Sequence, residues 1–186
     1  MMNWSPDIYA KAWEFATLAH QNQTYGGKTE GVEINYINHI GSVAMEVANA
    51  LQFSSDQLDA DLAIQCALLH DIIEDTKFTF YDVKSEFGED VAKGVSALTK
   101  NESLPSKRES MLDSLSRIRQ QPYEVWMVKM ADRICNLYHP PYYWDGQKIA
   151  SYREEAQLIF DHLNEANEVL ATRLKSKIGA YSNFLD

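Results

Sequence analysis

One short stretch of this sequence concentrates polar groups that could bind a metal and move a proton. His70, Asp71, Glu74 and Asp75 directly follow an apolar run at residues 67–69. His70 and Glu74 are four residues apart, as are Asp71 and Asp75, so each pair is expected to stack along one side of a helix. The negative end of the helix dipole disfavours three carboxylates there. A bound cation would offset that cost, so we predict a metal held by His70 and Asp71, with Glu74 and Asp75 acting one turn further along.

Two residues elsewhere in the chain are candidates to complete such a site. His39 lies at the start of a predicted helix, after a glycine-rich loop. Asp132 lies in an otherwise apolar helical stretch, where a carboxylate is costly unless it is paired or bound to a metal. With His70 and Asp71 they form a mixed nitrogen and oxygen donor set, which favours manganese or iron over zinc.

Each of these residues also has an ordinary structural interpretation. His39 could form a hydrogen bond at the start of its helix, and Asp132 could pair with Arg133 or Arg153. The two carboxylates that follow the His-Asp pair could belong to a solvated turn. The spacing of the residues by itself leaves both the metal site and these alternatives open.

The elements that must position these residues are almost all helical. Apolar residues recur at helical spacing, and Ser, Thr or Pro often marks the start of a segment. The expected helices cover roughly residues 6–20, 38–51, 58–69, 80–87, 91–100, 106–118, 122–137 and 151–175. Residues 21–36 contain three glycines and predict a loop, with one weak strand candidate at residues 32–36. The predicted fold class is all-α, with a single compact helical domain over residues 1–186.

Composition narrows the class of protein and its partners. A chain of 186 residues can bury a core without disulfides, and its 45% hydrophobic content is ordinary for a globular protein. The net charge of −10 argues against a nucleic-acid polymer as partner, because phosphate backbones need a basic face. No apolar run is long enough to span a membrane, and the first residues do not form a signal peptide. Cys66 and Cys135 are expected to be reduced, buried thiols in a cytoplasmic protein.

Five segments within residues 10–138 contain the chemically distinctive residues. They are YINH at 36–39 with VA at 43–44, ALLHD at 67–71 with EDT at 74–76, FGEDV at 87–91, LTK at 98–100, and KMADR at 129–133 with NL at 136–137. In order and spacing, these segments resemble the HD-domain metal-dependent phosphohydrolases. Within that superfamily they are most similar to the hydrolase domain of Rel/Spo-type alarmone enzymes and to the stand-alone small alarmone hydrolases.

The resemblance implies an all-helical enzyme that uses manganese to remove pyrophosphate from the 3′ position of guanosine tetra- and pentaphosphate, (p)ppGpp. It implies that His39, His70, Asp71 and Asp132 are the metal ligands. Fe²⁺, Mg²⁺ and Zn²⁺ are the alternative ions. The implied partner is a small phosphorylated nucleotide, with no membrane involved, and the sequence leaves open whether the protein forms a homodimer.

The resemblance also implies roles for residues around the metal. Glu74 and Asp75 would orient or deprotonate the attacking water, and Asn136 would form a hydrogen bond with the nucleotide near its ribose. Lys129 could contact a substrate phosphate, although it could equally pair with a local acid, and the same holds for Arg133.

Two segments depart from the family pattern. In the alarmone hydrolases the loop after the first helix carries adjacent basic residues, whereas here Tyr25 and Lys28 are the available substitutes, by stacking and by charge. Residues 138–141 also differ from the usual continuation. Two alternative functions therefore remain: an HD-domain hydrolase of another nucleotide or phosphoester, and a non-catalytic nucleotide-binding regulatory module. The aromatic loop at residues 142–144 could cover the pocket, pack on the last helix or form an interface, and we expect packing.

Overall fold

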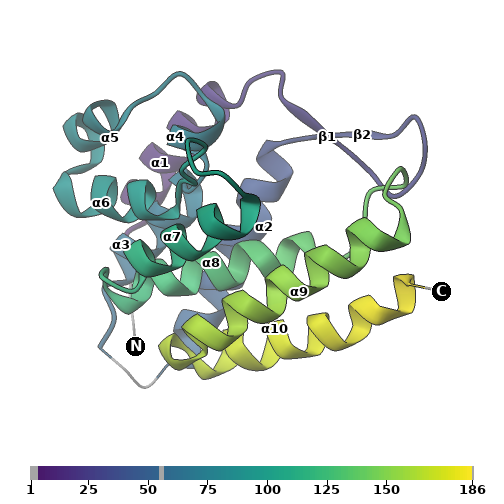
Figure 1. Cartoon of the computed structure of the whole chain (residues 1–186). Coiled ribbons are helices and arrows are strands. Elements are labelled where there is room, and N and C mark those ends of the chain that lie inside the picture. Colours follow the sequence, from purple (N-terminus) through teal and green to yellow (C-terminus); the bar gives the residue numbers. More distant parts are fainter. Residues whose placement is uncertain (1–3, 55–56, 186) are drawn as a thin grey trace.

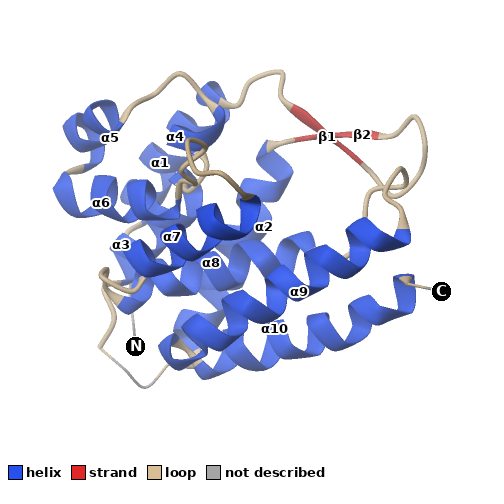
Figure 2. Cartoon of the chain, viewed as in Figure 1, coloured by secondary structure: helices blue, strands red, loops and turns tan. Residues whose placement is uncertain are grey.

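Helices make up most of the chain, as the apolar periodicity predicts (Figures 1 and 2). The computed structural model describes residues 4–54 and 57–185. Its helices are α1 (Pro6–Ala19), α2 (Ile37–Gln52), α3 (Ala60–Leu69), α4 (Ile72–Asp75), α5 (Phe80–Phe87), α6 (Glu89–Leu98), α7 (Lys107–Ile118), α8 (Tyr123–Asn136), α9 (Gly146–Leu163) and α10 (Glu168–Tyr181), with short 3-10 helices η1 (Asn164–Ala166) and η2 (Ser182–Phe184). The strands within the described ranges are β1 (Thr24–Gly26) and β2 (Glu33–Asn35). The all-α fold class is confirmed.

Helix α3 is apolar on nearly every side because other helices surround it. Helices α1, α2, α6 and α8 all pack against it. Its buried residues are Ala60, Ala63, Ile64, Cys66, Ala67, Leu68 and Leu69. A helix without a polar face is stable only in such an interior position. The packing therefore fixes the end of α3, where the His-Asp pair begins.

The chain breaks its helix at the His-Asp pair. Helix α3 ends at Leu69, and α4 begins only at Ile72, because Asp71 has a non-helical backbone with φ −101° and ψ 2°. The prediction that both i, i+4 pairs of this stretch lie along a single helix is therefore wrong. The amide of Asp75 still donates to the carbonyl of Asp71 at 2.8 Å, so these two residues are one turn apart.

The predicted last helix at residues 151–175 is in fact two helices, α9 and α10. Two asparagines explain the interruption. Asn164 donates its side-chain amide to the carbonyl of Phe160, and Asn167 is extended and accepts from the amide of Leu170 as the N-cap of α10. Asparagine competes for backbone hydrogen bonds in this way and so favours helix ends. The chain then folds back, and α10 packs along α9 (Figure 1).

The expected loop at residues 21–36 contains a short antiparallel hairpin. Strand β1 pairs with β2 so that Tyr25 lies opposite Ile34. The pairing continues where Gly27 donates its amide to Val32 at 2.9 Å. The weak strand candidate at residues 32–36 thus contains a strand, β2. Its partner β1 was not predicted, because three residues are too few to show an alternation of polar and apolar side chains. The hairpin lies at the edge of the molecule, beside the loop that leads into α9 (Figure 2).

Both cysteines are free thiols, but only one of the two is fully buried as predicted. Cys66 is buried, Cys135 is half-buried, and both are free thiols. Within the two described ranges, every helix is too short or too polar to cross a bilayer.

Gly94 in α6 has less free space around it than any other glycine of the chain, so its substitution tests the packing of α6 on the core. A Cβ at this position would lie 2.7 Å from the sulfur of Cys66 and 3.0 Å from a methyl of Val125. We expect Gly94→Ala to lower the free energy of unfolding by about 1–3 kcal/mol, because overpacking forces the helices apart. Gly179→Ala is the matched control, since its Cβ would meet no atom within 4 Å. Urea denaturation measures both, and an unchanged stability for Gly94→Ala would contradict this packing.

Candidate active site

The structure brings together the four residues predicted to bind a metal, from three separate parts of the chain. His39 lies in the first turn of α2, His70 and Asp71 lie between α3 and α4, and Asp132 lies in α8. The Nε2 atom of His39 is 3.3 Å from Nε2 of His70 and 3.4 Å from Oδ1 of Asp132. The Nε2 atom of His70 is 2.9 Å from Oδ2 of Asp71. We call these four residues the metal-site cluster.

The donor atoms of the metal-site cluster fit a divalent cation. Single donor atoms of His39, His70 and Asp132 all lie within 4.8 Å of one another. The Nδ1 atom of His70 is 2.8 Å from the carbonyl of Ala67, and a carbonyl can only accept, so Nδ1 carries the hydrogen. In a neutral His70 the lone pair of Nε2 then points towards His39 and the carboxylates. A cation between these groups would accept both imidazole lone pairs and balance the carboxylates.

The charges of the cluster are strongly coupled because the side chains are buried. Burial opposes protonation of His70, but the carboxylates of Asp71 and Asp132 outweigh it and raise its pKa to about 9. Burial likewise opposes ionisation of Asp132, yet Lys129 and the two histidines hold its pKa well below its usual range. Burial also opposes ionisation of Asp71, yet His70 holds its pKa below the usual range. Both carboxylates are therefore charged, and a proton on His70 partly balances them. A metal ion would take over that role and displace the proton.

Asp132 is held in place by two neighbours on its own helix. Lys129 Nζ lies 3.1 Å from Oδ2, and the side-chain amide of Asn136 donates to Oδ1 at 2.6 Å. Among the described residues, Asp132 is thus bonded by Lys129 and Asn136 rather than by Arg133 or Arg153, whose guanidinium groups bond to other partners. Both neighbours line the same cavity as Asp132. Their proposed contacts with a substrate remain predictions.

Glu74 faces the same cavity and is fixed by one residue of the connection after α6. The amide of Lys100 donates to Oε2 of Glu74 at 2.9 Å, and Nζ of Lys100 lies 2.7 Å from Oε1. Burial opposes the charge of Lys100, but Glu74 outweighs it and raises the pKa of the ammonium group. Glu74 is therefore held as one half of an ion pair at the rim of the metal-site cluster.

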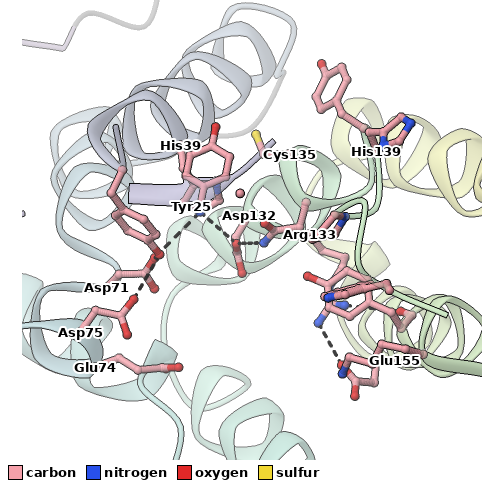
Figure 3. Close-up of a pocket in the computed structure, with 18 of the residues that line it drawn as sticks. Tyr25, His39, Asp71, Glu74, Asp75, Asp132, Arg133, Cys135, His139 and Glu155 are labelled. Carbon is pink, nitrogen blue, oxygen red and sulfur yellow. Dashed lines mark hydrogen bonds and ion pairs between the residues drawn. The ribbon is translucent and has the colours of Figure 1, made fainter. Parts of the chain in front are cut away.

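Tyr36 connects Asp75 to the metal-site cluster. Its hydroxyl lies 2.5 Å from Oδ2 of Asp71 and 3.1 Å from Oδ2 of Asp75. Burial, and then the charge of Asp71, raise the pKa of Asp75. Figure 3 shows Asp71, Asp75 and Glu74 following one another along one side of the cavity, with His39 and Asp132 next to Asp71. A carboxylate with a raised pKa beside a cation site is suited to accept a proton from water.

The cavity is large enough for a nucleotide. Its volume is about 1370 Å³, and it extends from the carboxylates to the hairpin and to the loop before α9. Tyr25 and Lys28 of the hairpin line it, and their contact with a substrate remains a prediction. The hydroxyl of Tyr25 accepts a hydrogen bond from the side chain of Asn38 at 2.8 Å, which orients the ring.

The aromatic loop at residues 142–144 both packs and lines the cavity. The ring of Trp144 lies 4.9 Å from that of Tyr152 in α9, with the rings edge to face. A Cβ at Gly26 would lie 3.3 Å from the ring of Tyr143, so the loop also touches the hairpin. Tyr143, Trp144 and Tyr152 all line the cavity. The loop thus forms part of the cavity wall.

Sequence reasoning assigned no role to two residues that organise the site. Tyr36 lies three residues before His39, so its helical spacing could have placed it beside the cluster. Lys100 lies 26 residues from Glu74, and no spacing rule connects them. Only the packing of α4 against α6 brings this pair together.

Comparison with known proteins now identifies the family. The family model described as HD domain matches residues 12–169. The chain belongs to the HD-domain family. The guanosine-3′,5′-bis(diphosphate) 3′-pyrophosphohydrolase MESH1 of Danio rerio is 33% identical over 175 residues, covering 92% of each chain. Human MESH1 is 29% identical over 172 residues, covering 89% of each chain. The bifunctional (p)ppGpp synthase/hydrolase SpoT of Escherichia coli is 32% identical over 132 residues, which are 68% of this chain and 17% of SpoT.

The fold of this HD-domain chain also matches a solved structure. A metazoan ortholog of SpoT that hydrolyses ppGpp superposes with a TM-score of 0.80 at 24% identity, and the match covers all of both chains. The predicted membership of the HD-domain hydrolases is confirmed. The family match extends to residue 169, beyond the predicted limit of 138.

The metal-site cluster makes a direct prediction for metal content. His70→Ala and Asp132→Ala should each abolish stoichiometric binding of a divalent metal, because each removes a buried donor atom of the set. Metal per chain is measured by elemental analysis after equilibration and desalting. His162→Ala is the control, since its Nδ1 is bonded to the carbonyl of Leu158 in α9. Full metal content in both cluster variants would exclude these residues as ligands.

Proposed function

We propose that this HD-domain protein is a metal-dependent phosphohydrolase that removes pyrophosphate from the 3′ position of guanosine tetra- and pentaphosphate. One observation supports this most strongly. A His-Asp donor set for a divalent cation lies in the same nucleotide-sized cavity as two further carboxylates, Glu74 and Asp75. The curated relatives with similar length are named for this same reaction.

The reaction is the hydrolysis of a phosphoester bond. Water adds to the phosphorus atom attached to the 3′ oxygen of the nucleoside, the bond from phosphorus to that oxygen breaks, and the oxygen takes up a proton. The products are pyrophosphate and a nucleotide with a 3′ hydroxyl. His39, His70, Asp71 and Asp132 would hold a divalent cation, which when bound would lower the pKa of water and polarise a phosphoryl oxygen. We propose manganese as this cation, because the donor set mixes imidazole with carboxylate.

Two carboxylates beside the metal-site cluster, Glu74 and Asp75, handle the attacking water. Asp75 accepts the proton of the attacking water, because its pKa is raised and the hydroxyl of Tyr36 fixes its direction. Glu74, which Lys100 holds through both oxygens, orients the water. Neither carboxylate needs to leave its present hydrogen bonds to face the cavity.

The substrate is held by groups around the metal-site cluster. Lys28 and Lys100 supply positive charge to the phosphates, and Tyr25 offers an aromatic face to the base. Asn136 lies beside Asp132 and so reaches the ribose next to the 3′ phosphate. Local cations suffice for such a ligand even though the whole chain carries a charge of −10.

A hydrolysis screen tests the substrate and the metal together. The purified protein, stripped with a chelator, should be inactive, and manganese should restore activity better than Mg²⁺, Fe²⁺ or Zn²⁺. Among guanosine tetraphosphate, guanosine pentaphosphate, other pyrophosphate-bearing nucleotides and nucleoside monophosphates, the first two should be cleaved fastest. Chromatography of the products should show free pyrophosphate.

The other outcomes of this screen are equally informative. Preferred cleavage of a different nucleotide would support an HD-domain hydrolase of another substrate, which the unusual loop with Tyr25 and Lys28 allows. Binding of the nucleotides with no turnover under any metal would indicate a regulatory module. Undiminished activity of the stripped protein would contradict a metal-dependent reaction.

The proposed roles of Glu74 and Asp75 predict that the loss of either carboxylate lowers turnover without removing the metal. Glu74→Gln and Asp75→Asn should each retain the metal but lower kcat by about 10²–10⁴-fold, the usual contribution of general acid–base groups. The matched control is Asp113→Asn, which changes a carboxylate paired with Arg117 in α7. Elemental analysis and steady-state kinetics on the same samples check both properties. A normal kcat in either variant would remove that residue from the mechanism.

A further inference from the structure

A buried carboxylate outside the metal-site cluster connects the C-terminal helix to the wall of the cavity. Glu46 lies in α2, seven residues after His39 and therefore on nearly the same face of the helix. Its side chain is only 9% exposed. A charge in this position is costly unless it is paired and fully hydrogen-bonded. The partner that balances Glu46 comes from α10.

Arg173 of α10 binds this carboxylate through two nitrogens. Its Nε atom lies 2.6 Å from Oε2 of Glu46, and its Nη2 atom contacts Oε1. This two-point geometry is the strongest and most directional pairing available to a carboxylate. It fixes α10 relative to α2, the helix that carries His39.

The same pair also holds Tyr138, two residues after the end of α8. The hydroxyl of Tyr138 donates to Oε1 of Glu46 at 3.2 Å, and Nη2 of Arg173 lies 3.5 Å from that hydroxyl. Lys177, one turn further along α10, places its Nζ 3.5 Å from the centre of the Tyr138 ring. Tyr138 is thus held at its hydroxyl and at its ring face.

Tyr138 lies at the start of the connection between α8 and α9, residues 137–145, which forms a wall of the cavity. The residues of this connection that line the cavity are Tyr138, His139, Pro141, Tyr143 and Trp144. Figure 3 shows His139 on the far side of the cavity from Glu74 and Asp75. The position of Tyr138 therefore determines the position of the first part of this wall.

We propose that Glu46 and Arg173 are positioning residues for substrate binding, which act by fixing Tyr138 and with it the cavity wall at residues 137–145. The inference rests on the proposed function in one respect, namely that the substrate occupies this cavity. The anchor formed by Glu46, Arg173 and Tyr138 is separate from the reacting groups. Its loss should therefore weaken substrate binding and leave the chemical step largely intact.

A purely stabilising role explains the anchor less well. Only Glu46 of this pair is buried, since the Arg173 side chain is 38% exposed, and ion pairs of either kind are weak evidence for a stabilising function. What the polar groups supply is direction, because the carboxylate must meet two nitrogens and one hydroxyl at once. Arg173 also lies beyond residues 12–169, the part of the chain that the HD-domain family model matches. The anchor is therefore a contribution of the C-terminal helix to the cavity.

Steady-state kinetics on three variants test this proposal. Arg173→Met and Tyr138→Phe should each raise KM for guanosine tetraphosphate by roughly tenfold, equivalent to one strong hydrogen bond, with kcat changed less than about twofold. Arg173→Lys should recover part of the loss, because it keeps the charge but not the two-point geometry. Tyr138→Phe keeps the Glu46–Arg173 pair, so it remains informative if Arg173→Met fails to fold.

Hydrogen exchange supplies a readout that does not depend on turnover. Backbone amides of residues 137–145 should exchange faster in Arg173→Met and Tyr138→Phe than in the unaltered protein. Ile178→Val is the matched control, because it loosens the core contacts of the same helix and keeps every polar group of the anchor. Lys93→Met controls for the loss of a surface ion pair, that with Glu89.

The outcomes separate this inference from the proposed function. Unchanged exchange at residues 137–145 in both variants, or a KM that rises equally in Ile178→Val, would overturn the anchor. A loss of kcat at constant KM would also overturn it. If the unaltered protein cleaves no guanosine polyphosphate, the proposed function fails, and the exchange data still decide whether the anchor holds the wall.

Discussion

The whole site depends on the mutual approach of two imidazole nitrogens and two carboxylates in a buried position. Nε2 of His39 and Nε2 of His70 are 3.3 Å apart, and the carboxylates of Asp71 and Asp132 lie beside them. Such a group is unfavourable without positive charge, because burial removes the water that would screen it. A proton on His70 balances part of the charge, and a divalent cation would balance it better. The surrounding helices keep these four side chains together.

The helices meet this requirement by converging on one point. Helix α3 is buried by its neighbours, so its end is fixed, and the break after Leu69 turns Asp71 towards the cluster. Helices α2 and α8 pack against α3 and bring His39 and Asp132 from either side. Lys129 and Tyr36 then hold the two carboxylates through side-chain hydrogen bonds. In the proposed anchor, α10 fixes Tyr138 and with it the cavity wall at residues 137–145.

The sequence predicted which residues meet at this site better than it predicted their local geometry. Helical periodicity and the family resemblance together gave the all-α fold, and they selected the four residues that the structure brings together. The break between α3 and α4 was missed because the sequence around Asp71 contains no Gly or Pro to mark the end of a helix. The bonds from Lys100 to Glu74 and from Arg173 to Glu46 join residues 26 and 127 positions apart. Such pairs depend on helix packing, which a single sequence does not reveal.

The most direct test of the metal site is a crystal structure of the protein with manganese, using anomalous scattering to locate the ion. We predict one strong anomalous peak per chain, in contact with Nε2 of His39, Nε2 of His70 and the carboxylates of Asp71 and Asp132. Glu74 and Asp75 should lie near the ion without coordinating it. A peak at any other position, or no peak in protein that hydrolyses its substrate, would contradict the central claim.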